Sequence, residues 1–235
     1  MNNKITIALI IAILAGFGGL VIWTSTRQAA PVTDYGDLEP NSIQTPNNLN
    51  GQIGDHLRGK TDSKVVFMEY ADMMCAGCAG SIFTVESLFD EYQDRVAFGF
   101  RHYPIQGHPN SRSAAAAVES AGMQGHFWEM LKAMYVERNS WLETTGSART
   151  DAYVEVFKRN VPDGDADKFK KNLGNPNIEN KINYDHELGV RQNVMATPSF
   201  YVNGKEISLE DCRTQMDIKN KISAEIDRQL AELDK

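Results

Sequence analysis

The chain has 235 residues, a formal net charge of -7 and three cysteines. This length suits one good-sized domain with appendages. The acidic balance, with no basic cluster, argues against a nucleic-acid partner. Three cysteines are too few for a disulfide scaffold, and a structural zinc site would need about four Cys or His ligands in two knuckles. The sequence therefore predicts no metal site.

Residues 5–23 form an uninterrupted uncharged run rich in Ile, Leu, Ala and Gly. As a helix, rising about 1.5 Å per residue, this run just spans a bilayer core of about 30 Å. Lys4 precedes the run and acidic residues follow it, so residues 1–4 are expected in the cytoplasm and the remainder outside it. A cleaved signal peptide is the alternative, although the run is long for one and no convincing cleavage site follows. We expect a retained single-pass anchor in the cell membrane and an extracytoplasmic, oxidising setting for the cysteines.

Residues 24–51 are rich in Pro, Asn, Gln and Thr and contain no large apolar cluster, which predicts a polar linker. The folded domain is then expected over residues 52–235. Its first strong strand signal covers residues 64–70, which are apolar on both faces, as in a central strand covered on both sides.

Cys75 and Cys78 form a C-x-x-C pair between this strand and a predicted helix. The helix carries one apolar stripe at spacings of four and three: Cys78, Ile82, Val85, Phe89 and Tyr92. Cys78 is therefore expected to be buried, and Cys75 to lie a turn earlier at the exposed helix start. The free N–H groups and the dipole there favour a thiolate on Cys75, while Cys78 could attack a mixed disulfide. This arrangement is the one that thiol–disulfide exchange needs.

The remaining elements follow in a definite order. Residues 95–101 predict a second strand, completing a β-α-β unit. Helical segments are expected over residues 111–135, 149–160, 165–173 and 177–188. Two short strands, 199–202 and 205–208, are joined by Asn203-Gly204, the strongest short hairpin signal. A last helix is expected from about Glu210.

Four separated segments, in this order and spacing, resemble the DsbA-like thiol–disulfide oxidoreductases, a branch of the thioredoxin fold with a helical insertion. They are Val66–Cys78, Arg101–Pro104, Ala121–Glu129 and Ala196–Gly204. The resemblance covers residues from about 60 to 210. It implies an α/β, thioredoxin-like fold (β-α-β, helical insertion at about 107–190, β-hairpin, α), here preceded by one transmembrane helix.

The resemblance also implies roles for residues of this chain. Cys75 would be the attacking cysteine and Cys78 the resolving one. Thr197 and Pro198 would form a cis-proline loop facing them, where the Thr197 backbone could pair with an extended substrate segment. The alternative for Pro198 is a proline that merely starts an edge strand.

The implied activity is the introduction of disulfides into exported polypeptides that carry free thiols. It needs no metal or organic cofactor, because the sulfurs carry the electrons. A membrane quinone-linked reoxidant of the DsbB-like or VKOR-like kind is expected as a partner, and the chain is expected to be a monomer.

Glu69 shares a strand face with Val65 and Phe67 by alternation, so it is expected to point into apolar surroundings near Cys78. A carboxyl group there would have a raised pKa and could exchange a proton with the buried thiol. An acidic residue six positions before the first cysteine resembles this role in the family. The alternative is a solvated acid at a strand end.

Three methionines, Met73, Met74 and Met195, raise an alternative from another class. Thioethers near two thiolates suit Cu(I), so a copper-handling protein of the same fold is conceivable. In an exchange enzyme they would form an adaptable apolar rim for unfolded substrates, with Met74 as a substrate-binding residue. A tethered binding module with a structural disulfide is a third interpretation. Cys212 is expected to be an inert structural thiol.

The dipeptide Ala76-Gly77 departs from the Pro-His often found in strong oxidants of this family. A histidine there would add positive character beside the thiolate and make the disulfide more oxidising. The net direction of the reaction therefore stays open, and a disulfide isomerase or reductase of the same fold is the alternative to an oxidant.

Overall fold

The computed structural model describes residues 34–233. Within that range no helix is both long and apolar enough to cross a membrane. The predicted anchor, residues 5–23, lies outside the described residues.

A five-stranded sheet in the order β1-β3-β2-β4-β5 forms the centre of the domain. Its strands are β1 (His56–Gly59), β2 (Val66–Ala71), β3 (Ala97–His102), β4 (Ser199–Val202) and β5 (Lys205–Glu206). β2 and β3 run parallel, while β1, β4 and β5 each run antiparallel to their neighbours. The predicted β-α-β unit and hairpin are thus confirmed, and β1 is a strand that the sequence pattern did not predict.

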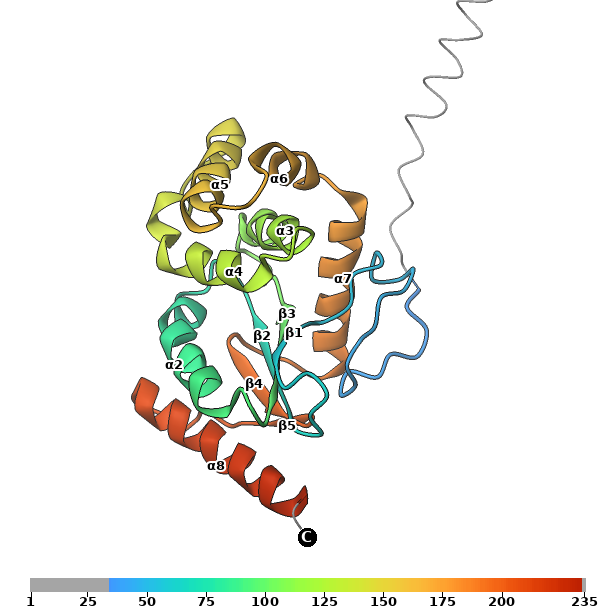
Figure 1. Cartoon of the computed structure of the whole chain (residues 1–235), viewed down its shortest axis with the longest axis vertical. Helices are drawn as coiled ribbons and strands as arrows, with labels where there is room; N and C mark the ends of the chain where they lie inside the picture. The colour runs from blue at the N-terminus through green and yellow to red at the C-terminus, as the bar shows by residue number, and fades with distance from the viewer. Residues whose placement is uncertain (1–33, 234–235) are drawn as a thin grey trace, which may run out of the picture. The chain divides into compact units, whose positions relative to one another are not determined.

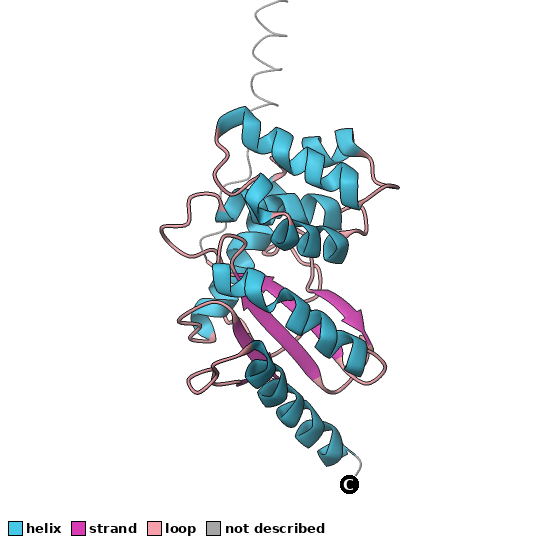
Figure 2. Cartoon of the chain, turned by 90° about the vertical axis from the view of Figure 1, so that its left-hand side faces the viewer, coloured by secondary structure: helices cyan, strands magenta, loops and turns pink. Residues whose placement is uncertain are grey.

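Helices cover both faces of the sheet and one of its ends (Figures 1 and 2). They are α2 (Ala76–Tyr92), α3 (Ser111–Gly122), α4 (Phe127–Val136), α5 (Gly146–Asn160), α6 (Ala166–Asn172), α7 (Pro176–Arg191) and α8 (Gln215–Leu233), with a short 3₁₀ helix η1 (Arg138–Ser140). α2 and α8 pack on one face, around Phe67, Phe98 and Phe200. α7 packs on the other, where Leu188 meets Tyr70. α3 to α6 form the helical insertion beyond the end of the sheet, as Figure 1 shows.

Several helix boundaries differ from the expected ones for local reasons. The segment expected as 111–135 is two helices, because the chain turns at Gly125 with a positive φ of 88°. α7 continues past Gly189, where a Cβ atom would lie 2.5 Å from the Tyr103 ring, so this glycine serves close packing instead of ending the helix. α8 begins at Gln215, after a turn that occupies the residues expected as its first turn.

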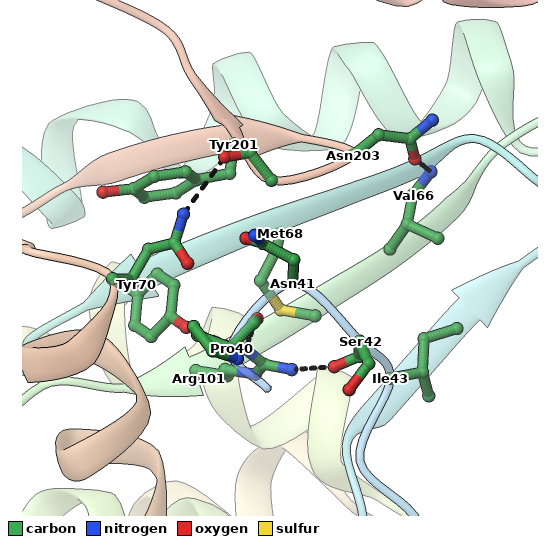
Figure 3. A pocket seen from close by; sticks show the side chains of 12 residues that line it. Pro40, Asn41, Ser42, Ile43, Val66, Met68, Tyr70, Arg101, Tyr201 and Asn203 are labelled. Carbon is green, nitrogen blue, oxygen red and sulfur yellow. Dashed lines mark hydrogen bonds between the residues drawn. The ribbon is translucent and has the colours of Figure 1, made fainter. Parts of the chain in front are cut away.

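The hairpin turn between β4 and β5 has the predicted chemistry. Asn203 and Gly204 both have positive φ, 47° and 76°, which favours Asn-Gly at these two positions. The Asn203 side chain accepts the Val66 N–H at 2.8 Å (Figure 3), so the turn also fixes the start of β2. The second hairpin strand is shorter than expected and ends at Glu206.

Residues 40–51, here called the strap, belong to the folded domain although they were predicted as the second half of a linker. The buried Arg101 of β3 donates to the carbonyl oxygens of Pro40 and Ser42 at 2.6 and 2.7 Å. Figure 3 shows the strap lying over the sheet beside Tyr201. The same guanidinium pairs with the buried Asp55 at 2.7 Å. The strap's polar residues therefore satisfy buried partners on the domain that are distant in sequence.

Candidate active site

Cys75 and Cys78 lie at the start of α2, where the structure separates their environments as the apolar stripe predicted. Cys75 is the N-cap residue, and its Sγ accepts the Cys78 N–H at 3.4 Å. Cys75 is partly exposed, whereas Cys78 is buried with 1% of its surface accessible. An attacker must reach Cys75 first, because Cys78 is closed off by the surrounding core.

Electrostatics reinforce this asymmetry. Hydrogen bonding with Cys78 is the main cause that lowers the pKa of Cys75 from 9.0 to about 5; Thr197 and the Cys78 and Gly77 amides add to it, against opposing burial. Burial raises the pKa of Cys78 far above its usual range, and the thiolate of Cys75 and the carboxylate of Glu69 raise it further. At neutral pH Cys75 is a thiolate and Cys78 a thiol, as exchange chemistry requires.

The loop before β4 faces the reactive sulfur. The Cys75 Sγ lies 3.2 Å from the Thr197 carbonyl oxygen. The Thr197–Pro198 peptide bond is cis, as the family resemblance implied. Pro198 stands one residue before β4, which begins at Ser199 and lies between β2 and β5, so it does not start an edge strand. Segments about 120 residues apart thus meet at one sulfur.

Gly77 lies close to both Pro198 and Cys75. A Cβ atom at this position would lie 3.2 Å from Pro198 Cδ and 3.6 Å from the Cys75 sulfur, so a larger side chain here would crowd the proline. Glycine adds no charged group beside the sulfur, and the pKa of Cys75 is lowered by hydrogen bonds with Cys78, Thr197 and the Gly77 amide.

Glu69 is buried on β2, with 5% of its surface accessible, so it is not a solvated acid at a strand end. Its register partners on the neighbouring strands are Phe100 and Phe200. Burial raises the pKa of Glu69 from 4.5 to about 8, with Arg58 opposing and Cys75 adding to the rise. A carboxyl group that is protonated at neutral pH beside a buried thiol can donate a proton to the Cys78 thiolate.

The three methionines do not form a common exposed rim. Met73 is buried, and the Met74 sulfur accepts the Asn110 N–H at 3.1 Å, so both are engaged by the protein itself. Met195, two residues before Thr197, has 83% of its surface exposed. The thioether exposed next to the Thr197 loop is thus that of Met195, whereas the sequence favoured Met74. Cys212 is partly exposed in the turn before α8.

Two residues at the site, Asp72 and Tyr135, were not predicted as site residues from the sequence. Asp72 is a buried carboxylate between β2 and Cys75. Tyr135 of α4 is buried and donates to the Asp72 carbonyl oxygen at 3.3 Å; burial first, then the charges of Cys78 and Glu69, raise its pKa. An aspartate at the end of an apolar strand is a visible turn signal. Tyr135 carries no such local signal in the sequence, because its position at the site depends on how α4 packs.

The mixed sheet, the dithiol at a helix N-terminus and the facing cis-proline define a thioredoxin-fold protein with a C-x-x-C active site, and together they support the class of thiol–disulfide oxidoreductases. The chain belongs to the thioredoxin family, whose sequence model matches residues 52–223.

Curated relatives match part of this domain. The chain is 32% identical over 152 residues to Na(+)/H(+) antiporter NhaA 3 of Salinispora tropica, covering 64% of this chain and 22% of the relative. It is 27% identical over 155 residues to NhaA 1 of Mycolicibacterium gilvum, covering 64% of this chain and 24% of that protein. The chain thus spans about a quarter of the length of the curated relatives it matches.

Solved structures share the fold. BdbD of Bacillus subtilis, in its oxidised form, superposes with a TM-score of 0.62 at 21% identity, covering 81% of this chain and 98% of that one. Pseudomonas aeruginosa DsbA2 gives a TM-score of 0.56 at 23% identity, covering 72% and 92%. The thiol–disulfide exchange protein alpha-DsbA2 of Wolbachia pipientis gives 0.61 at 17% identity, covering 74% and 87%. The helical insertion is therefore part of a fold seen in DsbA-type proteins.

Proposed function

We propose that this chain is an extracytoplasmic thiol–disulfide oxidoreductase that introduces disulfides into exported proteins through Cys75 and Cys78. The observation that carries the proposal is the opposite tuning of two sulfurs three residues apart: a partly exposed thiolate at a helix start and a buried thiol behind it. A structural disulfide would need neither the low pKa nor the exposure of Cys75.

The reaction starts from the oxidised pair. A substrate thiolate attacks the Cys75 sulfur, the Cys75–Cys78 bond breaks, and the Cys78 sulfur leaves with the bonding electrons. Glu69, protonated at neutral pH, supplies the proton that makes it a thiol. A second substrate thiolate then attacks the substrate sulfur of the mixed disulfide, and Cys75 leaves as a thiolate. Two electrons pass from the substrate to the enzyme, and the substrate gains one disulfide.

The stability of the reduced form favours this direction. Cys75 is a good leaving group, because its pKa lies well below that of an ordinary substrate thiol. Interactions that stabilise the thiolate are lost when the disulfide forms, so they make the pair more oxidising. Gly77 contributes no cation to this effect, and the direction rests on the donors of α2 and Thr197.

Exposed apolar side chains beside the site suit unfolded substrates. Met195 stands next to the Thr197 loop. A hollow between α2 and the start of α8 is lined by Phe83 and Met216, whose surfaces are 63% and 61% exposed. Flexible thioethers and one aromatic ring can pack against varied apolar sequences.

The setting of the reaction belongs to the same proposal. Residues 5–23 would anchor the chain in the cell membrane, with the N-terminus in the cytoplasm and the dithiol outside. A membrane quinone-linked partner of the DsbB-like or VKOR-like kind would reoxidise the pair. A disulfide isomerase or reductase is the second candidate. The observation that favours it is the dipeptide Ala76-Gly77, because without a cation between the two cysteines the disulfide is a weaker oxidant.

The test uses the oxidised chain and a reduced two-cysteine peptide. We expect stoichiometric peptide oxidation by the wild type and none by Cys75→Ser or Cys78→Ser, because neither variant can hold the oxidising Cys75–Cys78 disulfide. Cys212→Ser is the matched control and should keep the wild-type rate. Activity that disappears with Cys212→Ser and survives Cys75→Ser would contradict the proposal. Repair of scrambled ribonuclease by the reduced chain, without peptide oxidation by the oxidised chain, would favour the isomerase.

A further inference from the structure

Asp72 is a buried side chain on which several elements converge. It directly follows β2, and 1% of its surface is accessible. Its carboxylate accepts the Met74 N–H at 2.7 Å and the Ile105 N–H at 2.6 Å, and it accepts the Ser111 hydroxyl. His108 Nδ1 lies 3.1 Å from Oδ1. The carboxylate therefore joins the turn before α2 to the loop after β3 and to the first turn of α3.

The backbone of Asp72 contacts both cysteines. Its carbonyl oxygen accepts the Cys75 N–H at 3.0 Å and the Tyr135 hydroxyl. Its backbone amide favours the thiolate form of Cys78 and so opposes the rise in the pKa of that thiol. One residue thus touches the reactive sulfur's own backbone, the buried sulfur and the insertion.

The rest of the turn is held by the insertion as well. Arg138 of η1 donates to the Met74 carbonyl oxygen at 2.6 Å, and the Asn110 N–H meets the Met74 sulfur. None of these partners belongs to the sheet or to α2. The position of Cys75 relative to Thr197 is therefore set from the insertion side.

We propose that Asp72, which has His108 as an ion-pair neighbour at 3.1 Å, is a positioning residue through which the helical insertion holds Cys75 and Cys78 in their reactive arrangement. A buried carboxylate needs donors around it, and here two of them, Ile105 and Ser111, lie in the loop after β3 and at the start of α3, away from the cysteines in sequence. This inference rests on the proposed function, since it concerns the reactivity of the same dithiol.

Asp72→Asn separates positioning from charge. The amide has the same shape but cannot accept at its nitrogen, so at least one donor loses its partner and the turn shifts. We expect the pKa of Cys75 to rise by about one unit, a tenfold loss of thiolate below that pKa. Loss of a nearby negative charge alone would act in the opposite direction and lower the pKa of Cys75. The readout is the ultraviolet absorbance of the thiolate against pH, in the reduced full chain.

His108→Asn tests the second half of the pair and is the safer variant, since 35% of the His108 side chain is exposed. His126→Asn is the matched control: it is also partly exposed, and its carboxylate neighbour, Glu129, lies 3.8 Å away and outside the site. We expect His108→Asn to raise the pKa of Cys75 by less than Asp72→Asn and to slow peptide oxidation severalfold. His126→Asn should leave both unchanged.

The outcomes are distinct. A falling or unchanged pKa of Cys75 in folded Asp72→Asn overturns the inference. If that variant does not fold, identical pKa values in the two histidine variants overturn it instead. Failure of the wild type to oxidise the peptide overturns the proposed function, and the thiolate titration still decides the role of Asp72.

Discussion

Glu69 and Cys78 are two buried acids that are both protonated at neutral pH, and Glu69 adds to the rise in the pKa of Cys78. Burial is the largest cause for both groups. Cys75, by contrast, is the site's anion, because donors surround it. In the reduced site, therefore, the negative charge lies on the partly exposed sulfur of Cys75, while Glu69 holds a proton near the buried sulfur that leaves when the disulfide opens.

Glu69→Gln should slow the step in which Cys78 leaves, by about 10²-fold, the lower end of general acid–base effects. The amide fits the same space but has no proton to donate at this pKa. Stopped-flow reaction of the oxidised chain with a small thiol, followed from below pH 4.5 to above pH 8, measures this step. Glu206→Gln, on an exposed strand residue, is the control. Equal rates in wild type and Glu69→Gln at all pH values would refute the role.

The same substitution has a consequence for stability. Between pH 4.5 and about 8 the folded wild type keeps the Glu69 proton that the unfolded chain has lost. The unfolded state binds fewer protons, so the free energy of unfolding falls as pH rises through this window. Glu69→Gln should remove that decline, measured by urea unfolding of the reduced chain.

At the scale of elements, the buried Arg101 of β3 donates to two carbonyl oxygens of the strap and forms an ion pair with Asp55, which lies between the strap and β1. Arg101→Met would leave Asp55 with Lys181 at 3.5 Å as its remaining cationic partner among the described residues. Breaking such a pair from one side costs about 3–5 kcal/mol. Urea unfolding should show a loss of this size. Arg112→Met, whose pair with Glu179 is about half exposed, should change stability by about 1 kcal/mol or less. Similar small losses in both variants would mean that the strap is not part of the cooperative fold.

Elements that depend only on neighbouring residues could be predicted from the sequence. The apolar stripe from Cys78 gave the register of α2, and Asn203-Gly204 gave the hairpin, since each depends on neighbouring residues alone. β1 was missed, because His56 and Arg58 make its four residues look polar; both side chains pair with buried or partly buried acids, Glu119 and Glu86.

The strap and Asp72 show what local signals lack. Polar residues at 40–51 resemble a linker until Arg101, about sixty positions away, is seen to bind their carbonyl groups. The partners of Asp72 likewise come from the insertion. For the site, the C-x-x-C motif and the apolar stripe predicted both cysteines, strand alternation predicted the burial of Glu69, and the family resemblance implied the cis-proline. Met195 and Tyr135 depended on packing that no spacing encodes.

At the scale of the whole molecule, the chain consists of the described domain and a predicted membrane anchor. Residues 5–23 lie outside the described part, so the membrane location and the quinone-linked partner stay predictions. The described domain holds a dithiol with a low-pKa, partly exposed sulfur. In the proposed oxidant cycle this dithiol would be reoxidised after each substrate.

The reduction potential of the Cys75–Cys78 pair tests the central claim most directly. It can be measured by equilibrating the full chain with glutathione buffers and following the pair by alkylation and mass shift. The account predicts a value well above the roughly −270 mV of thioredoxin and toward the roughly −120 mV of the strongest oxidants, because the Cys75 thiolate is stabilised in the reduced form. A value at or below that of thioredoxin would contradict the assignment as an oxidant.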